Sequence, residues 1–175
     1  MMDSRTIKKA LETFTIIVDS REHITKKLEE RLNAMECPYV QRALRYGDYS
    51  ARVTLPDGGE FSLERAVCVE RKMNFSELCS CYSKQRDRFT REFERAKEDN
   101  AKLCLLVECA TWEKAYKGDY RSQMTSTALV ASMMTWVSRY NCQIFLCQAA
   151  TSGKIIKDIL YREMKERLKR VEDLP

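Results

Sequence analysis

The stretch Ala66-Val67-Cys68-Val69-Glu70-Arg71-Lys72 joins four apolar residues to a charged triplet. Four consecutive apolar residues are typical of a strand that is buried on both faces of a sheet. Because side chains alternate between the two faces of a strand, Glu70 and Lys72 are expected on one face and Arg71 on the other. A glutamate and a lysine at the end of a buried strand cost more free energy than the same pair on a surface. The triplet is therefore a candidate functional site.

A predicted β-hairpin leads into this strand. Residues 49–55 form its first strand, the turn Pro56-Asp57-Gly58-Gly59 follows, and residues 60–71 return. The hairpin can bring Asp48, at the start of the first strand, beside the end of the second. Two carboxylates and a lysine are what metal-dependent phosphodiester hydrolysis needs. The carboxylates hold a hard cation that acidifies a bound water, and the lysine orients that water or offsets charge on the phosphate.

The PD-(D/E)xK nuclease pattern can be matched here in two ways. Pro56-Asp57 followed by Glu70-x-Lys72 is the literal match, but Asp57 lies in the turn at the far tip of the predicted hairpin. Asp48 lies at the end of the hairpin that also carries Glu70. We therefore expect Asp48, rather than Asp57, to be the first ligand.

Strands and helices alternate along the remainder of the chain. Further strands are predicted at residues 13–18, 40–46, 102–107 and 142–147, and helices at residues 24–35, 75–99, 112–116, 127–140 and 152–172. Asp19 or Ser20 is the expected cap of the first helix, and Ser152 that of the last. This order predicts an α/β domain with a mixed central sheet flanked by helices. The 175 residues fit a single domain, with a core over residues 13–150 and a C-terminal amphipathic helix.

The composition favours a folded protein that stays inside the cell. Hydrophobic residues make up 44% of the chain and charged residues 33%, and 5 Gly and 3 Pro are too few for a disordered chain. No apolar run approaches the roughly 20 residues that cross a bilayer, and residues 1–9 lack the apolar stretch of a signal peptide. We expect no membrane partner, and a location in the cytoplasm of a prokaryotic or phage-infected cell, or in the nucleus of a eukaryote.

Eight cysteines and one histidine argue against a structural zinc site. No CxxC pair is present, and most of the cysteines lie within apolar runs, so buried thiols in a reducing compartment are expected. The net charge of +5 permits nucleic-acid binding without requiring it.

Four short motifs follow one another in a specific order: VDSRE at residues 18–22, GDY at residues 47–49, VERK at residues 69–72 and LLVE at residues 105–108. This order resembles the nuclease domain of the XPF family of structure-specific endonucleases, whose signature is GD…ERKxxxD. The likeness covers about residues 13–150 and looks similar to the short stand-alone versions that phages and bacteria carry. It implies a restriction-endonuclease-like core and metal-dependent cleavage of branched DNA, such as flaps, forks or junctions, in repair, recombination or phage DNA processing.

The resemblance also implies roles at the matching positions. Asp48 and Glu70 would bind Mg²⁺ or Mn²⁺, and Asp19, at an acidic position bordering the same site, would be a further metal ligand. Lys72 would serve the attacking water, and Arg71 is grouped with these catalytic positions, although strand geometry favours a supporting role for it. The remaining positions that would support the site are Arg21, Glu22, Glu77 and Glu108.

One position departs from the family signature. Ser76 stands where the pattern has Asp, and Glu77 is next to it. Either Glu77 substitutes for that residue through a small shift, or this outer acidic role is lost. The alternative to an active nuclease is therefore a weak or inactive DNA-binding or scaffold subunit that needs a partner.

The chain lacks the helix-hairpin-helix modules that the family's eukaryotic members carry. DNA binding would then come from the nuclease domain itself, from a homodimer or from a partner protein. Lys84, Arg88 and Arg91 on the predicted helix 75–99 are the candidate DNA contacts, and a solvated helix face is the alternative. The helix over residues 127–140 is apolar around much of its circumference, which makes it a candidate dimer interface.

Overall fold

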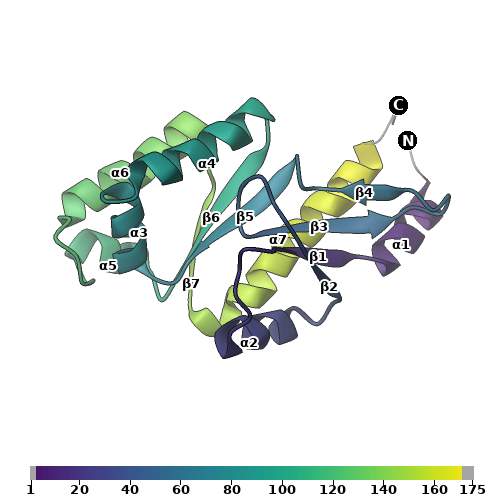
Figure 1. Cartoon of the computed structure of the whole chain (residues 1–175), viewed down its shortest axis with the longest axis horizontal. Coiled ribbons are helices and arrows are strands. Elements are labelled where there is room, and N and C mark those ends of the chain that lie inside the picture. The colour runs from purple at the N-terminus through teal and green to yellow at the C-terminus, as the bar shows by residue number, and fades with distance from the viewer. Residues whose placement is uncertain (1–2, 171–175) are drawn as a thin grey trace.

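A mixed sheet of seven strands runs through the computed structural model, which describes residues 3–170 (Figure 1). Its order is β2-β1-β3-β5-β6-β7, and the short β4 also pairs with β3. β3 is antiparallel to its neighbours β1 and β5, whereas the β1–β2, β5–β6 and β6–β7 pairs are parallel. The strands are β1 (Thr15–Asp19), β2 (Tyr39–Arg42), β3 (Tyr49–Thr54), β4 (Glu60–Ser62), β5 (Val67–Lys72), β6 (Lys102–Glu108) and β7 (Ile144–Cys147). The predicted α/β architecture with a mixed central sheet is confirmed.

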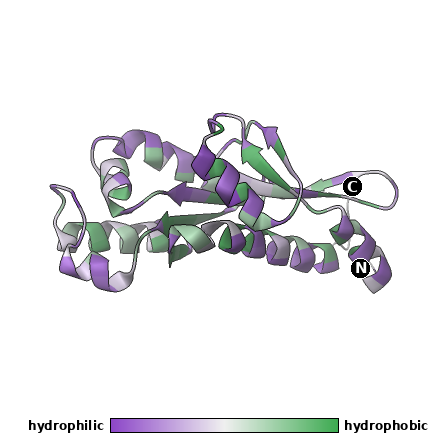
Figure 2. Cartoon of the chain, turned by 90° about the horizontal axis from the view of Figure 1, so that it is seen from below, coloured by the Kyte–Doolittle hydropathy of each residue, from purple (hydrophilic) through white to green (hydrophobic). Residues whose placement is uncertain are grey.

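Helices cover both faces of this sheet, and each has an apolar and a polar side (Figure 2). One face packs against α1 (Ser4–Glu12), α2 (Lys26–Met35) and α7 (Ala149–Arg170). The other face packs against α3 (Phe75–Tyr82), α4 (Arg86–Glu98), α5 (Trp112–Lys117) and α6 (Ser126–Tyr140). Among these helices of residues 3–170, none combines the length and apolar character that crossing a bilayer requires.

The central strands β5 and β6 explain the apolar runs in the sequence. Val69 and Leu106 belong to the core beneath α2 and α7, while Cys68 and Leu105 belong to the core beneath α3, α4 and α6. A strand with helices on both faces has no solvated side, so its residues are apolar at every position until the strand ends. The charged triplet begins at the end of the strand, where helices no longer cover both faces.

The predicted strand over residues 60–71 is interrupted. Residues 60–62 and 67–72 both lie along the same edge of β3, with Ser62 opposite Arg52 and Val69 opposite Tyr49. Between them the chain turns at Leu63, whose carbonyl oxygen accepts the N–H groups of Ala66 and Val67. The buried side chain of Leu63 fixes this excursion, which a pattern of alternating residues does not show.

The predicted helix over residues 75–99 is two helices. Ser83 leaves the helical conformation, and its hydroxyl donates a hydrogen bond of 2.7 Å to the carbonyl oxygen of Cys79. Serine competes with the backbone for hydrogen bonds in this way and so favours helix ends. The apolar stripe continues across the break, with Tyr82 and Phe89 in edge-to-face contact.

Two helix caps and one additional helix also differ from the sequence-based expectation. The cap of α2 is Thr25, whose hydroxyl accepts the N–H of Leu28, rather than Asp19 or Ser20. Ser152 lies inside α7 instead of capping it, and its hydroxyl donates to the carbonyl oxygen of Ala149. Helix α1 was not predicted, because it buries only Ile7 and Ala10. The part of the expected C-terminal helix beyond residue 170 lies outside the described residues.

Helices α2 and α7 touch backbone to backbone at Gly153. A Cβ atom at this position would lie 2.4 Å from the carbonyl oxygen of Arg31 and 3.3 Å from Cβ of Ala34. Glycine is therefore required here by the close approach of the two helices.

We predict that Gly153→Ala destabilises the protein by about 1–3 kcal/mol, because the added methyl group forces α2 and α7 apart. In an open helix interior the same change would stabilise by about 1 kcal/mol. Urea unfolding followed by circular dichroism measures the difference. An unchanged or higher free energy of unfolding would show that the contact is not tight.

Candidate active site

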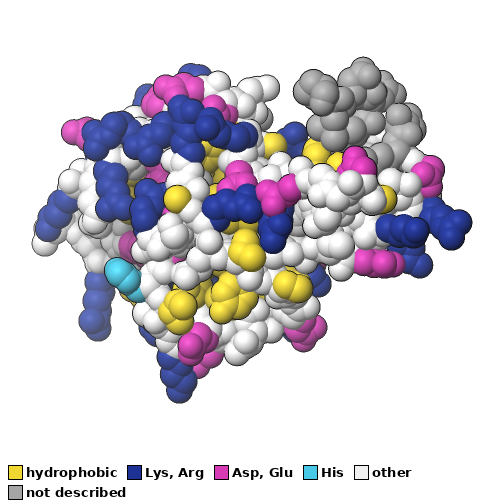
Figure 3. All heavy atoms as spheres, turned by 45° about the vertical axis from the view of Figure 1, so that its right-hand side comes forward, with side chains coloured by type: hydrophobic (Ala, Val, Ile, Leu, Met, Phe, Trp, Pro, Cys, Tyr) yellow, Lys and Arg dark blue, Asp and Glu magenta, His cyan; other side chains and the backbone are white. Residues whose placement is uncertain are grey.

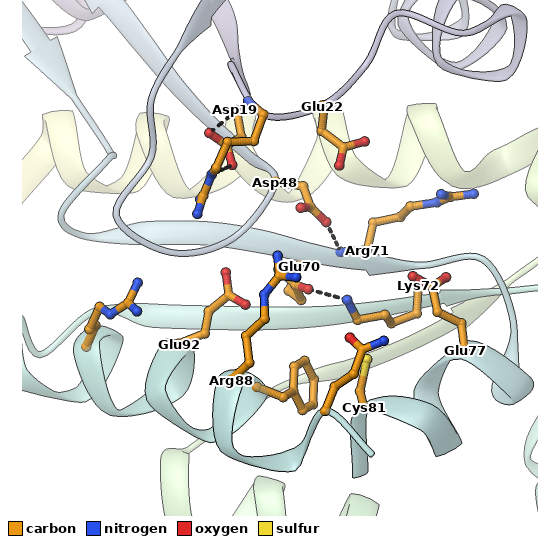
Figure 4. A pocket seen from close by; sticks show the side chains of 14 residues that line it. Asp19, Glu22, Asp48, Glu70, Arg71, Lys72, Glu77, Cys81, Arg88 and Glu92 are labelled. Carbon is orange, nitrogen blue, oxygen red and sulfur yellow. Dashed lines mark hydrogen bonds and ion pairs between the residues drawn. The ribbon is translucent and has the colours of Figure 1, made fainter. Parts of the chain in front are cut away.

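A pocket of about 270 Å³ opens at the carboxyl end of β5 (Figure 4). Its walls come from the ends of β1 and β5, the turn before β3, and helices α3 and α4. The residues that line it are Asp19, Arg21, Glu22, Asp48, Glu70, Arg71, Lys72, Glu77, Cys81, Gln85, Arg88, Phe89, Glu92 and Arg95. The fold thus brings together most of the residues predicted from the sequence.

The position of Asp48 is set by the glycine before it. Gly47 has a φ of +72°, and a Cβ atom there would lie 2.8 Å from Cβ of Cys68. The N–H of Asp48 then donates to the carbonyl oxygen of Val69 at 2.9 Å, and its carbonyl oxygen accepts the N–H of Asp19 at 2.8 Å. With its backbone held on both sides, Asp48 directs its carboxylate into the pocket, where Oδ2 accepts the N–H of Arg71 at 2.8 Å.

Glu70 and Lys72 point into the same pocket, as strand alternation predicts (Figure 4). Only 3% of Glu70 is exposed, and its Oε1 is hydrogen bonded to the ammonium group of Lys72. The ammonium also lies 5.3 Å from the ring centroid of Phe89. The second oxygen of Glu70, Oε2, is buried and has no hydrogen-bond partner among the described residues. A buried carboxylate oxygen without a partner is costly, so Oε2 is a favourable acceptor for a cation or a water in the pocket.

The two carboxylates resist ionisation in the metal-free protein. Burial raises the pKa of Asp48 to about 7, against the opposing charge of Lys72. Burial and the neighbouring Asp48 carboxylate raise the pKa of Glu70 well above its usual range. Burial lowers the pKa of Lys72, but the charges of Glu70 and Asp48 outweigh it and raise the pKa overall. The pocket floor therefore carries one firmly charged ammonium and an acidic pair that would be stabilised by a further cation.

These donors fit a hard divalent cation. Carboxylate oxygens are preferred ligands of Mg²⁺ and Mn²⁺, and Mg²⁺ commonly uses one or two carboxylates while it keeps several waters. Within residues 3–170, no three His, Cys, Asp or Glu side chains converge closely enough to hold an ion by themselves. Asp48 and Glu70 are the two side chains of the pocket that would hold such an ion, and Oε2 of Glu70 is the oxygen without a hydrogen-bond partner.

Asp19 borders the pocket with its carboxylate already engaged. Its oxygens accept the guanidinium of Arg21 at 2.5 Å and the N–H of Leu44 at 3.2 Å. Arg21 in turn donates to the carbonyl oxygen of Leu44 at 3.1 Å. Asp19 and Arg21 therefore fix the loop that leads to Gly47, and Glu22 lines the pocket beside them.

The side chain of Arg71 serves the opposite face of the sheet. Its guanidinium pairs with Glu108, which also accepts the Nε of Arg31 at 3.1 Å. Arg31 donates from its other arm to the hydroxyl of Tyr49 at 3.0 Å. Burial alone would raise the pKa of Glu108, but its hydrogen bond with Arg71 and the charges of Arg31 and Arg71 lower it. Arg71 thus gives the pocket its backbone N–H, and Glu108 supports the strand from behind.

The departure at Ser76 has a structural counterpart. The hydroxyl of Ser76 accepts the N–H of Arg121 and does not line the pocket, whereas Glu77 does. Glu77 Oε2 accepts the N–H of Met73 at 2.6 Å, and Asn74 caps α3 by accepting the N–H of Glu77 at 2.9 Å. The acidic side chain beside the end of β5 is therefore Glu77.

Of the three predicted DNA contacts, Arg88 lines the pocket, and Lys84 and Arg91 are exposed outside it. Basic side chains also gather on one face of the molecule, with acidic ones among them (Figure 3). Two charged pocket residues, Glu92 and Arg95, were not predicted as site residues. Their spacing from Arg88, four and seven positions along α4, places all three on one helix face and was the available signal.

We predict that Asp48→Asn stabilises the metal-free protein at neutral and alkaline pH. The folded-state pKa of Asp48 is raised, so its ionisation costs stability progressively from about pH 4 to about pH 7, and in full above that range. The gain should reach on the order of 1–2 kcal/mol above pH 7, less than the full shift implies because Asp48 is only half-buried. Thermal unfolding in EDTA across pH 4–9 measures it.

Asp57→Asn at the exposed hairpin tip is the matched control, and its unfolding should follow the wild-type curve at every pH. A gain for Asp48→Asn that is absent at pH 8, or that is equally large at pH 4, would contradict the expected destabilisation.

Comparison with known proteins agrees with this geometry. No curated protein sequence matches the chain significantly. Among solved structures, XPF from Aeropyrum pernix is similar at 20% identity and a TM-score of 0.61, over 90% of this chain and 68% of that one. The structure of XPF from Aeropyrum pernix in complex with DNA is similar at 19% identity and a TM-score of 0.59, over 91% and 68%. These likenesses confirm the expected fold.

The family follows from a sequence comparison that is independent of these structures. The model of the ERCC4 domain matches residues 18–159, which is well over half of the chain. The matched range contains every residue that lines the pocket. The chain therefore belongs to the ERCC4 domain family.

Proposed function

We propose that this protein is a divalent-metal-dependent DNA endonuclease that hydrolyses phosphodiester bonds in branched DNA. The observation that carries the proposal is the buried Glu70 carboxylate, which has one oxygen without a partner beside Asp48 and Lys72 in an open pocket. Family membership and the fold of XPF support DNA as the substrate. The acid pair would hold Mg²⁺ or Mn²⁺.

The cation, when bound, would supply Lewis-acid stabilisation of the phosphoryl oxygen and a water of lowered pKa. The remaining work belongs to the chain. Asp48 is held by the Arg71 N–H in the direction of the pocket, so its carboxylate needs little reorganisation. Lys72 stays protonated beside Glu70, where its ammonium can orient the attacking water or offset charge that develops on the phosphate.

The pocket rim provides cations for the DNA backbone. Arg88 and Arg95 line the pocket on α4, and Lys84 and Arg91 are exposed nearby in the chain. Phosphate contacts position DNA without reading its sequence, so recognition would depend on the shape of a branch. The exposed Met134 and Val137 of α6 support a homodimer as the way to reach both arms of such a branch.

Cleavage assays test the proposal directly. Purified wild-type protein should cut at least one of a labelled set of flap, fork and four-way DNA molecules in Mg²⁺ or Mn²⁺, and none in EDTA. Asp48→Asn and Lys72→Ala should each lower the cleavage rate by at least about 100-fold, because each removes a group acting at the reacting phosphate. DNA binding should be nearly unchanged in Lys72→Ala.

Asp57→Asn is again the control, and it should cleave at the wild-type rate. Binding without cleavage by the wild-type protein would favour the scaffold alternative or a missing partner, and Ser76→Asp would then be the first variant to assay. Cleavage that persists in EDTA would contradict a metal-dependent mechanism.

We predict that the double change Arg88→Ala and Arg91→Ala weakens binding to all DNA structures to a similar extent. Each lost phosphate contact should reduce the slope of log affinity against log salt by about 1. Fluorescence anisotropy between 50 and 300 mM salt measures this slope. The control variant Lys8→Ala with Lys165→Ala removes two positive charges from α1 and α7. An equal loss of DNA affinity in this variant would show that only the net charge of the protein matters.

A further inference from the structure

Helix α4 makes a contact with the site that the catalytic scheme does not use. Glu92 Oε1 accepts the N–H of Gly47 at 3.0 Å. Gly47 is buried, and its N–H has no other hydrogen-bond partner among the described residues. A buried N–H that loses its acceptor bears the full cost of desolvation, so this contact matters to the turn more than an exposed one would.

The bond to Glu92 holds the Gly47 end of this turn, and backbone bonds hold the Asp48 end. The backbone of Asp48 is bonded to Val69 and Asp19, but these bonds do not hold the peptide group between residues 46 and 47, to which the Gly47 N–H belongs. Gly47 has a left-handed conformation with little space around it, since a Cβ atom there would meet Cys68. The orientation of the Gly47-Asp48 unit is therefore fixed by β1 and β5 at one end and by Glu92 at the other.

Further bonds tie α4 to the loop that precedes this turn. Arg95 donates to the carbonyl oxygen of Arg45 at 3.1 Å, and the guanidinium of Arg45 pairs with Glu98 and Asp99. Arg88 lies on the same helix face as Glu92 at the pocket rim. One rigid helix thus carries a proposed DNA contact and the acceptor that anchors the ligand turn.

We propose that Glu92 is a positioning residue that fixes the Gly47-Asp48 turn through the Gly47 N–H and so sets the geometry of the first metal ligand. The inference rests on the proposed metal-dependent function. Glu92 acts as a hydrogen-bond acceptor, and it is not itself a third ligand, since no three acidic side chains in the described residues converge on one point. An amide oxygen can accept the same N–H, so Glu92→Gln preserves the role and Glu92→Ala removes it.

The first readout needs neither metal nor DNA. Hydrogen exchange of the Gly47 amide, followed by NMR in the metal-free protein, should become at least about 10-fold faster in Glu92→Ala and stay close to wild type in Glu92→Gln. Glu94→Ala is the matched control, because Glu94 is a carboxylate of the same helix that bonds the Tyr140 hydroxyl. Glu92→Leu is the second variant without an acceptor, for use if Glu92→Ala does not fold.

The second readout is Mn²⁺ affinity without DNA. Loss of an outer group that orients a ligand weakens metal binding by about 10-fold or more, so Glu92→Ala should show that loss while Glu92→Gln stays within about threefold of wild type. The melting temperature in EDTA should be lower for Glu92→Ala than for Glu92→Gln, because only Glu92→Ala leaves the buried Gly47 N–H without an acceptor. Equal loss of Mn²⁺ affinity in Glu92→Gln and Glu92→Ala would overturn the acceptor role and indicate a direct charge or ligand role.

The two readouts separate this inference from the proposed function. If the wild-type protein binds no Mn²⁺, the metal-dependent function fails, and Gly47 exchange still decides whether Glu92 fixes the turn. If Gly47 exchanges at the wild-type rate in Glu92→Ala and Glu92→Leu, the positioning role is wrong whatever the protein cleaves.

Discussion

The whole site depends on how the backbone of Asp48 joins two strands that are not neighbours in the sheet. Its N–H bonds to β5 at Val69 and its carbonyl oxygen accepts from β1 at Asp19, so this residue begins β3 by spanning both partners. The chain can enter that position only through Gly47, whose left-handed conformation leaves no room for a side chain against Cys68. The first carboxylate is therefore placed by main-chain bonds, which are stiffer than side-chain contacts. Strand pairing brings the Asp48 carboxylate close to Glu70, although two carboxylates repel each other.

The alternation of side chains along β5 places the pocket residues on one face of the sheet and a supporting arginine on the other. Glu70 and Lys72 face the pocket, while Arg71 between them faces a buried cluster with Glu108 and Arg31. Such a cluster adds little to the overall stability, since the cost of removing charges from water offsets much of their attraction. Its main effect is to fix the orientation and register of the end of β5. A shift or rotation of the end of β5 would separate Arg71 from the buried Glu108 carboxylate, so the register that puts Glu70 in the pocket is also the one that keeps this ion pair.

Much of this could be predicted from the sequence because it depends on local periodicity. The apolar residues 66–69 before Glu70 predicted a central strand, and the alternation of side chains predicted that Lys72 lies on the same face as Glu70. What could not be predicted depends on contacts between residues far apart in the chain. The bond between Gly47 and Glu92 joins positions 45 residues apart, and that between Arg31 and Glu108 joins positions 77 apart. In the sequence, Glu92 looks like a member of an ordinary charged run, and Glu108 ends an apolar run that does not indicate Arg31 as its partner. The break at Ser83 was missed because the apolar stripe continues through it while only the backbone changes direction.

The charges of the pocket impose an order on its proposed chemistry. A phosphate that approaches the floor meets the carboxylates of Asp48, Glu70 and Glu92, with Lys72 as the cation beneath them. The arginines of the rim can attract the DNA backbone, but they lie on α4, and the floor itself carries the ammonium of Lys72 beside an acid pair that resists ionisation. A divalent cation on the acid pair would favour the ionised form of both side chains and satisfy the unpaired oxygen of Glu70. In the proposed mechanism, DNA binding at the rim would therefore be separable from entry of the reacting phosphate, which would depend on the metal.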